Sequence, residues 1–137
     1  MKIRFVTEGG INEYWEGAKR QDCDLLVFGF EGLGEVDYRR ELAGETSKLE
    51  DLAILSREAG CTVVAGCVTD SRGVRRKSAA VAEKGKILGV ADMLHVTDPS
   101  EFKGGAHLKV YETAAGKLGV LPHETNFEVS QVNGYMT

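Results

Sequence analysis

The chain of 137 residues has no long apolar run, few prolines and few cysteines. A membrane-spanning helix needs roughly 18 or more consecutive apolar residues, so none is predicted. Two prolines are too few for a proline-rich, low-complexity sequence. The three cysteines are odd in number and lie in or beside apolar segments. This pattern argues against a disulfide framework and favours reduced thiols in a cytoplasmic protein.

The chain also lacks an excess of basic residues. Its formal net charge is −4 at pH 7, which gives no general attraction for nucleic acid. A local basic group of Arg72, Arg75, Arg76 and Lys77 flanks an expected hairpin turn, and we interpret it as a solvated turn. Residues 1–5 begin a strand pattern and lack the apolar core of a signal peptide. We therefore expect no nucleic-acid or membrane partner, and nothing in the sequence implies a cofactor.

Hydrophobic periodicity predicts a mixed α/β domain with about two helices and about seven strands. Strands are expected over 2–7 and 25–30, in an antiparallel meander over 61–91, and in a last pair over 107–113 and 117–121. One helix is expected over 12–20. A second should run through residues 49–59, with Ser47 and Glu50 as a capping box and Gly60 as its left-handed stop. Residues 32–44 are expected to form a loop, and the tail after Pro122 to be irregular.

The segments 25–30 and 61–68 are almost entirely apolar, which is typical of strands buried on both faces of a sheet. Two helices can cover one face, and no further segment is expected to cover the other. A second copy of the sheet, packed face to face at about 10 Å, would provide the missing cover. We therefore predict a homodimer through the sheet face.

The order of elements between residues 49 and 96 carries a family signature. A helix ending in Arg-Glu-Ala-Gly precedes the strand Thr-Val-Val-Ala-Gly, then a hairpin with Ser-Ala-Ala-Val at 78–81 and Gly-Lys-Ile-Leu-Gly at 85–89. This order resembles the middle of a carbon–nitrogen hydrolase (nitrilase/amidase) domain, and the resemblance extends from Met1 to about Phe127. It implies a nitrilase-like αββα sandwich. The family's domain has two comparable αβ halves, so residues 1–137 are expected to form a single, truncated domain that supplies about one half, one sheet with two helices.

The resemblance also implies where a reaction centre would lie. Family members use a glutamate as general base, a lysine that stabilises the oxyanion, and a cysteine nucleophile. The glutamate follows a strand in a context such as Asp-Leu-Ile-Val-Phe-Pro-Glu, whereas residues 24–31 read Asp-Leu-Leu-Val-Phe-Gly-Phe-Glu. Glu31 is thus one residue late, which on a strand turns its side chain to the other face unless Gly29 absorbs the shift in a bulge. Glu31 is either the retained family position or an exposed residue opening a loop.

The other two positions hold different residue types. The family's Tyr-Arg-Lys-x-His-Leu corresponds to Ala-Asp-Met-Leu-His-Val at 91–96, so Met93 replaces the lysine while His95 keeps the histidine. The family's Lys-Ile-Gly-Val-Leu-Ile-Cys corresponds to Lys-Leu-Gly-Val-Leu-Pro-His at 117–123, so His123 replaces the nucleophile. Losing one oxyanion donor costs on the order of 2.7–4 kcal/mol. Glu31, Met93 and His123 are therefore the candidate catalytic positions, and His95 and Glu124 the candidate binding residues.

These replacements favour a degenerate carbon–nitrogen hydrolase-like domain that lacks cysteine-dependent amide or nitrile hydrolysis. Its role would be the binding of a small-molecule ligand or that of a subunit. An alternative is an active hydrolase with a rearranged site, in which Glu31 works with His123 or Cys67. A third interpretation is a structural partner that completes a sandwich with another polypeptide. His95, His107 and His123 do not have the spacing of a recognised metal site, so we expect no metal.

Overall fold

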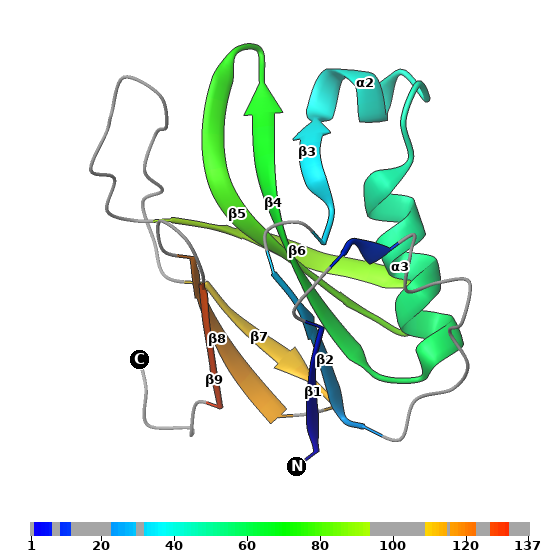
Figure 1. Ribbon diagram of the computed structural model, residues 1–137, viewed down its shortest axis with the longest axis vertical. Coiled ribbons are helices and arrows are strands. Elements are labelled where there is room, and N and C mark those ends of the chain that lie inside the picture. Colours follow the sequence, from blue (N-terminus) through cyan, green and yellow to red (C-terminus); the bar gives the residue numbers. More distant parts are fainter. Residues whose placement is uncertain are drawn as a thin grey trace.

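The computed structural model describes residues 2–6, 9–11, 23–29, 32–93, 109–114, 116–122 and 127–131. They form two sheets and two helices (Figure 1). The six-stranded sheet has the order β1–β2–β4–β5–β6, with β3 also beside β4. Its strands are β1 (Ile3–Val6), β2 (Leu25–Phe28), β3 (Gly34–Asp37), β4 (Thr62–Ser71), β5 (Val74–Glu83) and β6 (Lys86–Asp92). The helices are α2 (Tyr38–Leu42) and α3 (Lys48–Ala59). A three-stranded sheet contains β7 (Lys109–Thr113), β8 (Gly116–Pro122) and β9 (Phe127–Gln131).

The six-stranded sheet combines parallel and antiparallel pairing. β1 pairs with β2 in parallel, and β2 and β3 each pair in parallel with β4. β4, β5 and β6 form an antiparallel meander, which confirms the arrangement predicted for residues 61–91. All four residues of β2 are buried, as the apolar sequence indicates. The predicted helix over 12–20 lies outside the described residues.

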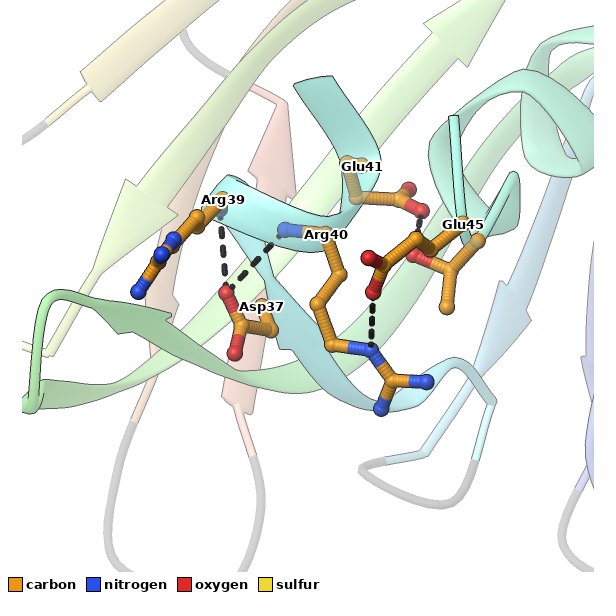
Figure 2. Close-up of polar contacts among 6 residues, drawn as sticks. Asp37, Arg39, Arg40, Glu41 and Glu45 are labelled. Atoms are coloured by element: carbon orange, nitrogen blue, oxygen red, sulfur yellow. Dashed lines mark hydrogen bonds and ion pairs between the residues drawn. The ribbon is translucent and has the colours of Figure 1, made fainter. Parts of the chain in front are cut away.

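The expectation of a loop over residues 32–44 is wrong. This segment contains β3 and α2, and within β3 only Val36 is buried. Asp37 then begins α2, because its Oδ1 accepts hydrogen bonds from the backbone N–H groups of Arg39 and Arg40 at 3.0 and 3.3 Å (Figure 2). Such a carboxylate satisfies donors that the first helical turn leaves open. One buried side chain and a five-residue helix leave too short an apolar pattern to recognise in the sequence.

The predicted long helix is confirmed as α3, and Gly60 ends it in the left-handed conformation with φ 71°. The predicted capping box is wrong. Ser47 makes no side-chain cap. Instead, the Glu41 carboxylate accepts hydrogen bonds from Lys48 N at 3.2 Å and Leu49 N at 2.9 Å, and from the Thr46 hydroxyl. The cap of α3 therefore comes from α2, a contact that local spacing does not reveal.

The two faces of the large sheet are covered by different parts of the chain. α3 packs on one face, where Leu52, Leu55 and Ala59 join the core formed by Leu26, Phe28, Val63 and Ala65. On the other face, Leu118 and Val120 of β8 pack with Leu25, Val27, Val64, Ala79, Val81 and Ala91. We call this second group the inter-sheet core. The premise that no segment of the chain covers this face is therefore wrong, because the last predicted strand pair packs there.

The two sheets approach closely at β6. A Cβ added to Gly89 would come within 2.6 Å of Tyr111 Cε1, so only glycine leaves room for this ring. β9 lies in the tail expected to be irregular, and it pairs with β8 through backbone hydrogen bonds. The mixed α/β architecture predicted from the sequence is confirmed, with a second sheet added to the expected one. Neither described helix has the length and apolarity needed to cross a membrane.

Candidate functional site

The segment that holds Glu31 is fixed at both ends. Gly29 O accepts hydrogen bonds from Gly32 N at 2.9 Å and from Gly66 N at 3.0 Å. Gly32 has no room for a side chain, since an added Cβ would lie 2.8 Å from Phe28 Cβ. These contacts anchor a tight connection directly after β2. Glu31 itself lies outside the described residues.

The strand register is interrupted at this connection. Phe28 pairs with Ala65 of β4, whereas Gly34 pairs with Cys67. Residues 29–33 of the β2–β3 segment thus correspond to the single residue 66 of β4. The regular strand register with β4 is therefore interrupted between Phe28 and Gly34, and the parity argument for position 31 assumed an uninterrupted strand.

Met93 directly follows β6 and is 1% exposed. Its N–H donates to Lys77 O at 2.8 Å, which extends the register in which Ser78 lies opposite Asp92. Alternation places Met93 on the face of Ala91, the face of the inter-sheet core. A thioether carries neither positive charge nor N–H donor. Position 93 therefore provides no cation for an oxyanion.

A lysine nevertheless stands beside Met93. Lys77 lies in β5, is half-buried, and alternation places its side chain on the same face as Ala79 and Val81. The interpretation of the basic group as a solvated turn holds for Arg72, which is exposed at the hairpin tip. It is wrong for Arg75, Arg76 and Lys77, which are half-buried within β5. The sequence signal was the alternation of residues 77, 79 and 81, which places Lys77 on the same strand face as two apolar residues. Lys77 is the functional candidate that the sequence analysis missed.

Three strands that lead to the candidate catalytic positions border the inter-sheet core. β2 precedes Glu31, β6 precedes Met93 and β8 precedes His123, and each strand places side chains in this core. β2 and β6 run in the same direction, because β2 is parallel to β4 and both β4–β5 and β5–β6 are antiparallel. Their carboxyl ends thus share one edge of the sheet. His95, His123 and Glu124 lie outside the described residues.

Cys67, the alternative nucleophile, lies on the opposite face, in the core beneath α3. It is fully buried, and burial, aided by the charge of Asp92, raises the pKa of its thiol to about 12. Asp92 Oδ1 accepts a hydrogen bond from Ser78 Oγ at 2.6 Å, and Ser78 is 3.3 Å from the Thr69 hydroxyl. A nucleophilic cysteine must be a thiolate. At neutral pH Cys67 is instead a protonated core residue.

The part of the chain that the structure describes contains no cluster of three His, Cys, Asp or Glu side chains that could hold a metal ion. All three histidines of the sequence, His95, His107 and His123, lie outside that part. The expectation that these three histidines bind no metal therefore stays a prediction.

The fold is similar to part of the fold of amidases from the nitrilase superfamily. A cysteine-to-alanine mutant of the Nesterenkonia AN1 amidase matches with a TM-score of 0.66 and 18% identity over 88% of this chain and 55% of that chain. An amidase from Nesterenkonia sp. matches with a TM-score of 0.61 and 19% identity over 88% and 54% of the two chains. This chain has a carbon–nitrogen hydrolase-like fold.

A mutant of the Nesterenkonia amidase in complex with butyramide matches with a TM-score of 0.60 and 17% identity, covering 88% of this chain and 55% of the amidase. The carbon–nitrogen hydrolase-like chain thus spans about half the length of these amidases. No protein-family model matches its sequence, and neither does any curated protein.

Proposed function

We propose that this carbon–nitrogen hydrolase-like domain is a pseudoenzyme that binds a small amide-type ligand, or acts as a subunit, without cysteine-dependent hydrolysis. The proposal is supported by the burial of Met93, at the position that the sequence resemblance assigns to the family's lysine. The amide class is suggested by the butyramide bound in one structurally similar amidase. The free thiols Cys23, Cys61 and Cys67 further support a cytoplasmic location as part of the proposal.

The placement of the thiols supports the absence of thiol chemistry. In a similar amidase, fluoroacetamide adds covalently at the active-site cysteine. The three cysteines of this chain lie at the start of β2, immediately before β4 and within β4, and none follows β8. Burial raises the pKa values of Cys61 and Cys67 to about 12. No thiol therefore stands where the resemblance requires a nucleophile.

We expect the purified protein to bind butyramide and to release no ammonia from it above a protein-free control. Binding is measured by isothermal titration calorimetry, and hydrolysis by an ammonia assay at neutral pH. The family's cysteine nucleophile and lysine ammonium act on the transition state of hydrolysis. A chain that lacks both can therefore still bind an amide after turnover is lost. Ammonia release that the substitution Glu31→Ala abolishes would show that the hydrolase activity has survived.

A specific observation favours the alternative of an active hydrolase. Lys77 lies beside Met93 on the inter-sheet face and could donate to an oxyanion in place of the family's lysine. If turnover is detected, Lys77→Met should reduce kcat by on the order of 100- to 1000-fold, the effect of removing one oxyanion donor. Lys86→Met is the matched control, because Lys86 is an exposed lysine at the other end of β6. Equal rates for the two variants would exclude a role for Lys77.

The subunit role includes self-association. On the sheet face where we predicted the homodimer, β8 covers β2, β4, β5 and β6, whereas Ile3 and Phe5 of β1 lie on the same face beside Leu25 and Val27. The proposed contact therefore narrows to the end strand β1. Among the described strands β1 ends the sheet order, and its Phe5 and Ile3 side chains are 66% and 42% exposed. Exposed apolar side chains on the strand at the end of a sheet can pack against another copy.

We expect the wild-type protein to sediment as a dimer at micromolar concentration and Phe5→Ser to shift it toward the monomer. The shift follows from the loss of apolar area at the proposed contact. Leu42→Ser is the control, because Leu42 is 90% exposed on α2, away from β1. A monomeric wild-type protein would remove self-association from the proposal.

A further inference from the structure

Two thiols from distant parts of the chain meet at the end of the large sheet opposite to Met93. Cys23 Sγ lies 3.8 Å from Cys61 Sγ, although 38 residues separate them. Cys23 precedes β2 and is half-buried, while Cys61 follows α3 and is 8% exposed. Both belong to the core on the α3 side. The sulfur atoms are in contact but unbonded, since a disulfide needs a separation of about 2.05 Å.

This thiol pair opens into a cavity of about 400 Å³. Its wall includes Arg57 and Lys84 as cations, together with Asp24 and Glu83. The wall thus carries two positive and two negative side chains, and Arg57 Nη2 also lies 3.5 Å from Glu58 Oε1. Asp24 Oδ2 accepts from Lys2 N at 2.8 Å, and Glu83 Oε1 accepts from the Thr62 hydroxyl at 3.2 Å and from Ala114 N. The cavity therefore offers two adjacent thiols to a small reactant, within a polar wall that carries side chains of both charges.

We propose that Cys23 and Cys61 form a dithiol site that a small disulfide, such as oxidised glutathione, converts to an intramolecular disulfide. In the first step, the Cys23 thiolate attacks one sulfur of the reactant and expels a thiolate, which takes up the proton that Cys23 lost. In the second step, the Cys61 thiolate attacks Cys23 Sγ of the mixed disulfide and expels the second thiol. Two protein thiols are oxidised, and one disulfide is reduced to two thiols.

The difference in burial between the thiols sets the order of the steps. Cys23 is the more accessible sulfur, so it meets the reactant first. Burial, and next the proximity of Cys23, raises the pKa of Cys61 to about 12. The contribution of Cys23 disappears once it is part of a mixed disulfide, but burial remains. The second step should therefore be slow at neutral pH and accelerate about tenfold per pH unit, in proportion to the thiolate fraction.

The test is incubation of the folded full chain with oxidised glutathione, followed by intact-mass measurement and peptide mapping under non-reducing conditions. The expected product has the mass of a single chain less two hydrogen atoms, with no disulfide between chains, and contains a Cys23–Cys61 peptide. Cys67→Ala should give the same crosslink, because the buried Cys67 thiol is not part of the site. Cys61→Ser should stop at a glutathione adduct on Cys23.

Other outcomes would overturn the proposal. These are the absence of a crosslink in the folded wild-type protein, a crosslink that contains Cys67, or a disulfide between chains. Circular dichroism before oxidation verifies that each variant is folded, and Cys61→Ala replaces Cys61→Ser if the serine variant is unfolded. An adduct on Cys23 that persists in the wild-type protein as the pH is raised would equally count against Cys61 as the second thiol.

Discussion

Replacing Leu118 with alanine should lower the free energy of unfolding by about 2–5 kcal/mol, the range for truncating a buried leucine. Leu118 lies in β8, is fully buried and belongs to the inter-sheet core. The truncation removes apolar contacts and leaves a cavity between two sheets whose backbones are held by their own hydrogen bonds. Urea denaturation followed by circular dichroism measures the change.

Val110→Ala is the control for this experiment. Val110 lies in β7 of the same small sheet, but its side chain is 46% exposed. Its truncation should change the free energy of unfolding by no more than about 0.5 kcal/mol, as is usual for surface positions. Similar losses for the two variants would mean that β8 does not cover the large sheet. An uncovered apolar sheet face would then again favour a homodimer through that face.

Local patterns predicted the elements whose signal lies within one segment. The apolar run of β2, the periodic stripe of α3 and the turn residues of the β4–β6 meander each identify their element without help from distant residues. Lys84 and Gly85, at the turn between β5 and β6, adopt positive φ angles of 53° and 82°, as the turn requires. These segments also carry the family resemblance, so the fold could be predicted from them.

Contacts between distant segments could not be predicted in the same way. The β7–β8 pair was expected, but periodicity does not say on which face of another sheet a hairpin packs. β3 depends on its pairing with β4 more than on its own composition, since only Val36 is buried. The break between Gly29 and Gly34 likewise becomes visible only in the register with β4.

At the candidate site, too, the sequence order identified one residue, whereas strand pairing was needed to find another. The sequence order identified Met93, and its burial agrees with a position inside the domain. Lys77 was assigned to a turn because it belongs to a basic group beside the β4–β5 hairpin, although alternation with Ala79 and Val81 places it on the inter-sheet face. Strand pairing, and not the local sequence, thus reveals Lys77 as a candidate beside Met93.

The second large effect is expected at the cap of α3. Glu41→Ala should lower the free energy of unfolding by about 1–2 kcal/mol, the upper part of the range for losing a helix cap. The substitution leaves Lys48 N and Leu49 N without the carboxylate that accepts their hydrogen bonds. Ser47→Ala is the control and should change stability by no more than about 0.5 kcal/mol, because Ser47 makes no side-chain cap. A larger loss for Ser47→Ala would restore the capping box predicted from the sequence.

The pH dependence of this cap follows from the pKa of Glu41. Burial alone would raise it, but the hydrogen bonds from Leu49 N, the Thr46 hydroxyl and Lys48 N, with the charge of Lys48, bring it below the ordinary value of 4.5. The folded state therefore holds the proton less tightly than the unfolded state, so the stabilisation is complete above pH 4.5 and is lost as the pH falls through the folded-state pKa. Urea midpoints of the wild type and Glu41→Gln should differ by a constant amount at higher pH and converge in acid. A difference that persists after Glu41 is protonated would show that its charge does not stabilise α3.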